Sequence, residues 1–204
     1  MSLQPFTLIT GKAAPMLAAN IDTDVIMPKQ FLRGIDRSGL DRGLFFDLRF
    51  LPNGEPNPGF VLNQPAWQDA TFLVVGPNFG CGSSREHAVW GLKQMGIRAL
   101  IGSSFAGIFY DNCQRNGVLL ITLEEAVLQK LGQTVSQPEQ AQISVDLEAQ
   151  VARLADGEVI PFQIDTLRKT ALLLGLDAIG STLQRSEQIR AFERKHLQAN
   201  PWLS

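Results

Sequence analysis

One turn of the chain gathers small, hydroxyl-bearing and basic residues. Residues 78–87 read Asn-Phe-Gly-Cys-Gly-Ser-Ser-Arg-Glu-His and follow an apolar run at 71–75 that is typical of a strand buried on both faces. A helix is predicted from Ser84 to about Met95, so it begins inside this turn. Amides of a first helical turn have no internal partner and carry the positive end of the helix dipole, which suits an anion. Arg85 adds a planar cation that can hold a carboxylate or a phosphate through two hydrogen bonds.

The same turn also has simpler interpretations. Ser83 and Glu86 have the spacing of a capping box, in which the serine caps the helix and the glutamate bonds back to it. Capping and anion binding do not exclude each other. Cys81 at a helix start can be an activated thiolate, although a small buried residue is the favoured interpretation. His87 is expected to be a packed helix residue and not a catalyst.

Known phosphate-binding motifs fit this turn poorly. Gly80 and Gly82 begin a G-x-G-x-x-G pattern and let the backbone approach a ligand, but Arg85 stands where the third glycine belongs. The strand that follows lacks a convincing acidic residue at its end, and no Gly-Lys-Ser/Thr string is present for a P-loop. The dinucleotide interpretation is therefore weak.

A second candidate patch lies near the N-terminus. Asp22 and Asp24 flank a threonine, a short apolar strand is predicted after them, and the loop that follows carries Arg33. Taken alone, this patch is better explained by a turn with solvated carboxylates and a surface arginine than by a functional site.

Composition excludes several classes of protein. The 204 residues are 45% hydrophobic and 19% charged with a formal net charge of −2, which argues against disorder and against binding along nucleic acid. No apolar run is long enough to cross a membrane, and the first residues do not resemble a secretory signal, so we expect a cytoplasmic protein.

Cysteine and histidine counts restrict metal chemistry. Cys81 and Cys113 are the only two cysteines, and with two histidines they form no zinc-binding spacing and no disulfide framework. An iron–sulfur cluster usually needs about four thiolates, so this chain is not expected to hold one alone. Any metal would have to come from another polypeptide.

The turn is embedded in an alternating pattern of strands and helices. Strands are predicted at 71–75, 99–101 and 118–123, with helices at 84–95 and 105–115 between them. Strand, helix, strand, helix, strand at this spacing favours parallel pairing through helical crossovers.

Other elements complete a mixed α/β chain with one continuous core. A Pro-, Gly- and Asn-rich loop is predicted at 51–58, and a polar stretch at 132–140 precedes the second half. Further elements are expected there: an alternating segment at 143–147, a hairpin of 151–154 with 159–162, and helices at 165–174 and 186–198, while Ser103 and Ser104 are expected to cap the helix at 105–115.

Three strings together resemble the aconitase superfamily: Gly82–His87, Thr23–Ile26 and Ser104–Phe109. The resemblance is closer to the family of small subunits of bacterial 3-isopropylmalate dehydratase, and it covers nearly the whole chain. It implies one swivelling β/β/α domain of aconitase type over residues 1–204. This fold is a mixed sheet or partly open barrel flanked by helices, here with a C-terminal helical extension.

The resemblance also implies an activity, a cofactor and a partner. Such enzymes interconvert 2-isopropylmalate and 3-isopropylmalate in leucine biosynthesis by removing and re-adding water. The departing hydroxide is polarised by one iron of a [4Fe–4S] cluster. That cluster belongs to the large subunit of the dehydratase, so no cofactor is expected on this chain, in agreement with its two cysteines. The resemblance implies that the substrate is a small hydroxy-dicarboxylate.

Roles for individual residues follow from the same resemblance. Ser83 is expected to be the base that removes the proton α to a carboxylate, with Ser84 and Arg85 binding a substrate carboxylate. Arg33 matches a second substrate-binding arginine, and Asp24 matches an aspartate that pairs with a histidine of the cluster-bearing partner.

Substrate choice is expected to lie near Phe31, Leu32 and Arg33. The two apolar side chains suit an isopropyl group, whereas the arginine suits an additional carboxylate. Small subunits of related dehydratases, acting on citraconate, methylmalate or homoaconitate, share these motifs and stay open as alternatives. So do a non-catalytic carboxylate-binding module and a thiol enzyme that uses Cys81.

Overall fold

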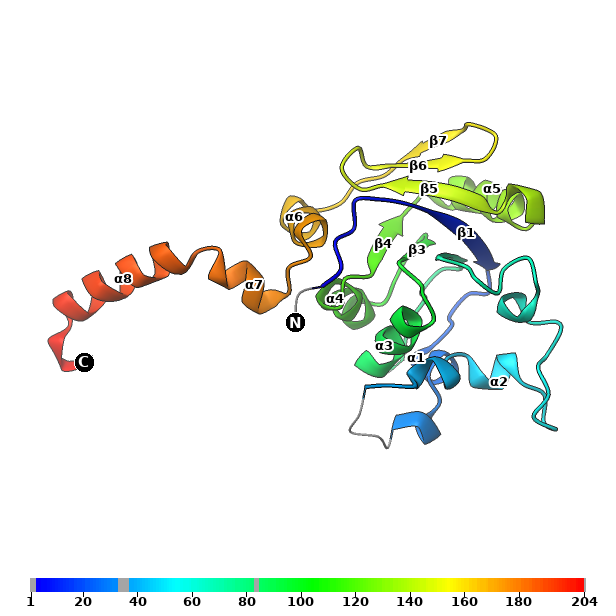
Figure 1. Cartoon of the computed structure of the whole chain (residues 1–204), viewed down its shortest axis with the longest axis horizontal. Coiled ribbons are helices and arrows are strands. Elements are labelled where there is room, and N and C mark those ends of the chain that lie inside the picture. The colour runs from blue at the N-terminus through cyan, green and yellow to red at the C-terminus, as the bar shows by residue number, and fades with distance from the viewer. Residues whose placement is uncertain (1–2, 33–36, 83–84, 204) are drawn as a thin grey trace.

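A computed structural model of the chain describes residues 3–32, 37–82 and 85–203. Its centre is a curled sheet of seven strands in the order β4-β3-β2-β1-β5-β6-β7, which forms a half-barrel with helices around it (Figure 1). The strands are β1 Leu8–Met16, β2 Phe72–Val75, β3 Ala99–Gly102, β4 Leu119–Thr122, β5 Gln142–Asp146, β6 Val151–Leu154 and β7 Val159–Pro161.

The sheet has a parallel half and an antiparallel half that share β1. Strands β1 to β4 pair in parallel, and β2, β3 and β4 are linked through α3 (Glu86–Gln94) and α4 (Gly107–Arg115). This confirms the predicted crossovers. Strand β1 also pairs antiparallel with β5, which continues into the β6–β7 hairpin that was expected from residues 151–154 and 159–162. The swivelling-domain fold class is therefore confirmed in its mixed sheet and flanking helices.

Side chains of the central strands alternate between two apolar layers. On one face, Leu73 and Val75 of β2 pack with α3 and α4. On the other, Phe72 and Val74 pack with β5 to β7, with α5 (Glu125–Val135) and with α6 (Thr166–Leu174). The expectation of one continuous core is corrected, because the buried residues form two clusters separated by the sheet.

Short helical turns between β1 and β2 cover the end of the sheet that bears the candidate turn. They are α1 (Thr23–Ile26), α2 (Phe46–Arg49) and the 3-10 turns Lys29–Leu32, Leu40–Arg42 and Val61–Asn63. The prediction of a strand after Asp24 is wrong, because residues 23–26 form the helical turn α1. The Asp22 side chain caps this turn by accepting a hydrogen bond from Val25 N at 2.8 Å. The loop at 51–58 is largely exposed, as predicted.

The C-terminal region extends away from the sheet (Figure 1). It consists of α7 (Ala178–Leu183), α8 (Ser186–Ala199) and a 3-10 turn at Pro201–Leu203, none of which contributes a buried residue. Large apolar side chains are exposed here, among them Phe192 at 69% and Trp202 at 75%. No helix in the described part of the chain is both long and apolar enough to cross a membrane.

Candidate active site

The turn after β2 lies directly against α1. Thr23 N donates to Cys81 O at 2.9 Å, Gly80 N donates to Ile21 O at 2.8 Å, and Asp22 and Cys81 form a parallel bridge. Backbone hydrogen bonds thus join the two patches that the sequence shows as separate, and the predicted binding turn and the predicted acidic turn become one site.

A pair of asparagines closes the turn on one side. Asn78 Nδ2 donates to Asn20 Oδ1 at 2.8 Å, and both residues have positive φ angles, 57° and 59°. Asparagine tolerates this left-handed conformation better than other non-glycine residues, which explains the residue type at both positions. Sequence reasoning did not single out these two residues. The signal that could have identified them is an asparagine at the start of each turn, because asparagine is common at positions with positive φ.

Ser104, after β3, holds the start of the turn. Its Oγ accepts from Asn78 N at 2.9 Å, and its carbonyl accepts from Phe79 N at 3.3 Å. The prediction that Ser103 and Ser104 cap α4 is wrong, because Ala106 is the N-cap residue and makes no side-chain capping bond. The hydroxyl of Ser104 instead ties the candidate turn to the neighbouring parallel strand.

Gly80 allows α4 to pack against the turn. It has φ +77°, and a Cβ atom there would lie 2.2 Å from Cγ of Phe109. The Phe109 ring also packs edge-on against Phe79, with centroids 5.6 Å apart. A glycine is therefore needed at position 80 for close packing against α4, whether or not the turn also binds a ligand.

Helix α3 begins at Glu86, with Arg85 as its N-cap residue. The capping-box interpretation is wrong on the glutamate side, because Glu86 occupies the first helical position and not the third. Its Oε1 accepts from Asn116 Nδ2 at 2.7 Å. Ser83 and Ser84, the expected base and one expected carboxylate ligand, lie outside the described residues.

Arg85 and Asp24 form an ion pair between the two halves of the site. Nη1 of Arg85 donates to Oδ1 of Asp24. The Arg85 side chain is 19% exposed and the Asp24 side chain 47%, so both groups remain open to solvent. A partly exposed guanidinium at a helix start offers the kind of cation that binds a carboxylate.

Phe31 and Leu32 lie in a 3-10 turn beyond α1 and are half-buried against the core. The Phe31 ring lies 5.0 Å from that of Phe46. Arg33, which follows them, is outside the described residues. After that gap the chain is attached to α3: the Arg37 guanidinium lies 4.2 Å from the Trp90 ring centroid, and Leu40 N donates to Gln94 Oε1 at 2.7 Å.

The remaining nucleophilic and basic groups near the turn differ in their burial and contacts. Cys81 is a free, partly buried thiol, and Cys113 is a free thiol of the core. Burial raises the pKa of the Cys113 thiol well above its usual value. The His87 ring packs on Trp90 at 4.7 Å, in line with its expected place as a packed helix residue.

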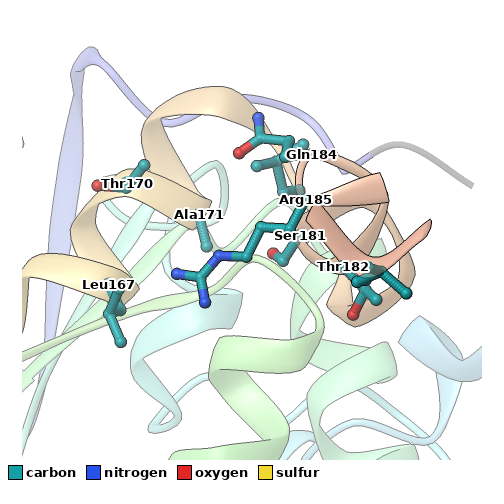
Figure 2. A pocket seen from close by; sticks show the side chains of 9 residues that line it. Leu167, Thr170, Ala171, Ser181, Thr182, Gln184 and Arg185 are labelled. Carbon is teal, nitrogen blue, oxygen red and sulfur yellow. The ribbon is translucent and has the colours of Figure 1, made fainter. Parts of the chain in front are cut away.

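No metal-binding cluster is formed within the described ranges: no three His, Cys, Asp or Glu side chains converge there. A pocket of about 540 Å³ lies elsewhere, between α6 and α7, where Arg185 reaches across from the end of α7 (Figure 2). Its described lining contains none of the predicted site residues.

This fold and this turn define a domain of aconitase type. Residues 3–126 match the family model described as the aconitase C-terminal domain. Residues 129–166 match a LeuD_N model, and residues 179–204 match the model of the C-terminal domain of the 3-isopropylmalate dehydratase small subunit.

Relatives match over nearly the full length of the chain. A 3-isopropylmalate dehydratase small subunit 1 of Mannheimia succiniciproducens is 64% identical, covering 98% of this chain and 99% of that protein. A small subunit 2 of Salmonella choleraesuis is 57% identical, covering 98% and 96%. The crystal structure of a 3-isopropylmalate dehydratase from Methanocaldococcus jannaschii has a TM-score of 0.66 and 25% identity, covering 91% of this chain and 99% of that one. The chain belongs to the family of 3-isopropylmalate dehydratase small subunits.

Proposed function

We propose that this chain is the small subunit of a cytoplasmic 3-isopropylmalate dehydratase, which interconverts 2-isopropylmalate and 3-isopropylmalate in leucine biosynthesis. It is a hydro-lyase component that works only with a large subunit. The observation that most supports the proposal is the ion pair of Arg85 with Asp24, in which a guanidinium of the family's turn already holds a carboxylate. Full-length relatives at 64% and 57% identity support the substrate class.

The reaction divides between two chains. A proton must leave the carbon α to a carboxylate, and hydroxide must leave the adjacent carbon. Hydroxide is a poor leaving group, and an iron of a [4Fe–4S] cluster would polarise it as a Lewis acid. We assign that cluster to the large subunit, because this chain has two cysteines, of which Cys113 is wholly buried.

This chain provides the base in the proposed mechanism. Ser83 removes the α-proton, and its oxygen needs a positive environment to carry the resulting charge. Two described features of the residues that follow Ser83 in the sequence support such an environment. Arg85 provides a cation, and the first-turn amides of the nine-residue helix α3 present the positive end of its dipole. Ser84 and Arg85 would bind one substrate carboxylate, and Arg33 the other.

Asp24 has two partners in this proposal. In the free chain it neutralises Arg85. In the assembled enzyme it would pair with a histidine of the large subunit, while the substrate carboxylate takes its place at the guanidinium. The exchange of one carboxylate for another keeps Arg85 compensated throughout, so no unpaired cation has to be buried when the site closes.

Substrate choice is assigned to Phe31 and Leu32. Both are half-buried on the apolar cluster that also contains Leu40 and Leu44, so they can extend that surface toward an isopropyl group. Burial of such a branched group against an apolar wall contributes about 1.5–3 kcal/mol, which favours it over a methyl group.

The proposal is tested by reconstitution. The purified chain is mixed anaerobically with the large subunit of a 3-isopropylmalate dehydratase, and hydration of isopropylmaleate is followed by ultraviolet absorbance. Citraconate and homoaconitate are assayed in parallel. Turnover with the highest kcat/KM for isopropylmaleate supports the proposal. A higher kcat/KM for citraconate or homoaconitate would identify the chain as the small subunit of a related dehydratase. Binding of diacids without turnover would identify it as a carboxylate-binding module.

A further inference from the structure

A polar cluster joins the start of α3 to the end of α4. Asn116, the C-cap residue of α4, is only 8% exposed. Its Nδ2 donates to Glu86 Oε1 at 2.7 Å and to Asn112 O at 2.9 Å, while its Oδ1 accepts from Trp90 Nε1 at 3.0 Å. The Asn-Gly dipeptide signals a helix end in the sequence, but nothing in it shows that the side chain reaches α3.

The partners fix the orientation of the Asn116 amide. An indole N–H only donates, and a carboxylate or a backbone carbonyl only accepts. A flipped amide would therefore face three mismatched groups. The three hydrogen bonds are buried or partly buried, and an unpaired buried polar group costs about 1–3 kcal/mol, so the cluster is expected to hold one geometry.

Helix α4 contacts the candidate turn at two places, of which only the second belongs to this cluster. Near its start, Phe109 of α4 packs where a Cβ on Gly80 would stand. At its end, Asn116 binds Glu86, the residue directly after Arg85. The turn is thus fixed at both ends to the same helix.

The cluster also separates the charges of two adjacent residues. Glu86 and Arg85 are neighbours in sequence with opposite charges. Glu86 bonds to Asn116, whereas Arg85 bonds to Asp24 of α1. With its carboxylate held by α4, Glu86 does not occupy the guanidinium that the substrate needs.

We propose that Glu86 and Asn116 are positioning residues, which hold the Arg85 guanidinium in place for the substrate carboxylate. The proposal rests on the function proposed above. It assigns Arg85 as the group through which both residues act, and it assigns Trp90, the third member of the cluster, no part in catalysis.

Three variants in the reconstituted enzyme separate positioning from packing. Glu86→Ala removes the bond to Asn116, and we expect KM to rise by about tenfold or more, with a smaller change in kcat. Glu86→Gln keeps an acceptor oxygen at the same place and should restore KM. Trp90→Phe is the matched control: it removes the indole donor to the same asparagine, but both acceptors of Nδ2 remain and still orient the amide. The Glu86 bond is therefore kept, and KM should stay near the wild-type value.

A double-mutant cycle tests whether the effect passes through Arg85. In an Arg85→Ala background, Glu86→Ala should raise KM little further, because the group that it positions is already absent. Asn116→Ala removes the same bond from the other side and should behave like Glu86→Ala, which keeps the test valid if one variant folds poorly. Thermal midpoints of the free chains report folding.

The outcomes are distinguishable. A wild-type complex that turns over none of the acids overturns the proposed function and this inference with it. An active wild-type complex overturns only this inference if Glu86→Ala and Asn116→Ala keep the wild-type KM. The inference is also overturned if Glu86→Ala raises KM by the same factor in the Arg85→Ala background as in the wild-type chain. A rise of KM in Trp90→Phe as large as that in Glu86→Ala would overturn it as well.

Discussion

Arg85 donates a hydrogen bond to Asp24 across 61 positions of sequence. The contact is possible because backbone bonds hold α1 against the turn after β2, the bond from Thr23 N to Cys81 O at 2.9 Å among them. A cation held by the fold before a ligand arrives loses less conformational entropy on binding than a free arginine side chain. The free chain is therefore expected to present its carboxylate-binding group already in place.

Substituting Asp24 separates its proposed catalytic role from its contact with Arg85. In Asp24→Asn the side chain keeps its shape but no longer competes as a carboxylate for the guanidinium. We expect kcat of the reconstituted enzyme to fall about a hundredfold or more, with KM unchanged or lower. Steady-state kinetics measure both constants, and Asp47→Asn, an exposed carboxylate of α2, is the control. A raised KM with wild-type kcat would limit Asp24 to supporting Arg85.

The shape of the cation matters in addition to its charge. Arg85→Lys keeps a positive charge but replaces a planar group of five N–H donors by a point charge. We expect kcat/KM to fall about 10- to 100-fold, mainly through KM, because one of two parallel hydrogen bonds to the substrate carboxylate is lost. Arg153→Lys, at an exposed position of β6, should leave both constants unchanged. Equal kinetics for the two variants would contradict the assigned role of Arg85.

Close packing at the turn predicts a large stability effect at Gly80. Gly80→Ala combines a positive φ of +77° with a contact of 2.2 Å to Phe109, and we expect it to cost about 2–4 kcal/mol of unfolding free energy. Gly39→Ala shares the positive φ but meets nothing within 4 Å, so it should cost only about 1–2 kcal/mol. Urea denaturation measures both, and equal losses would show that Phe109 moves aside at no cost.

The parallel half of the fold could be predicted from local signals. Continuous apolar runs indicate β2, β3 and β4, and the helices predicted at 84–95 and 105–115 correspond to α3 and α4. The signal is clear there because a strand buried on both faces needs an unbroken apolar run.

Elements stabilised by distant contacts were missed. Helix α5 was obscured by Gly132, which counts as a helix breaker in sequence but packs here against Leu17, where a Cβ would meet Cδ1 at 2.8 Å. Strand β1 has no continuous apolar run, since it is buried only in part and pairs with β2 and β5. Tertiary packing outweighs propensity in both cases.

The sequence names candidate residues for the site, but it does not give the contacts between them. The sequence singles out Asp24 and Arg85 as candidates. Their pairing, and the bond of Asn116 to Glu86, join segments that only the folded sheet brings together. No periodicity or motif spacing encodes such contacts.

The two thiols should differ in reactivity. Burial raises the pKa of Cys113, so its thiol stays protonated in the folded chain, whereas half-buried Cys81 is accessible. Iodoacetamide at pH 8 should alkylate Cys81 first, with Cys113 reacting only after unfolding, as peptide mass spectrometry would show. Because the folded pKa of Cys113 lies above the unfolded one, its contribution to stability is complete below the unfolded pKa and is lost as the pH rises toward the folded value.

A second measurement on the same thiols concerns activity. Cys81→Ala should keep most of the turnover of the reconstituted enzyme, since the proposed base is an oxygen and not a sulfur. Loss of activity in that variant, with partner binding intact, would favour the thiol interpretation of the turn.

The most direct measurement is the turnover of Ser83→Ala in complex with the large subunit. Removal of a single hydroxyl that acts as the base is expected to lower kcat by about 10²–10⁴. The affinity for the large subunit and the thermal midpoint should stay at wild-type values. Wild-type kcat in that variant, within a complex shown to be intact, would contradict the claim that this chain provides the proton-abstracting group.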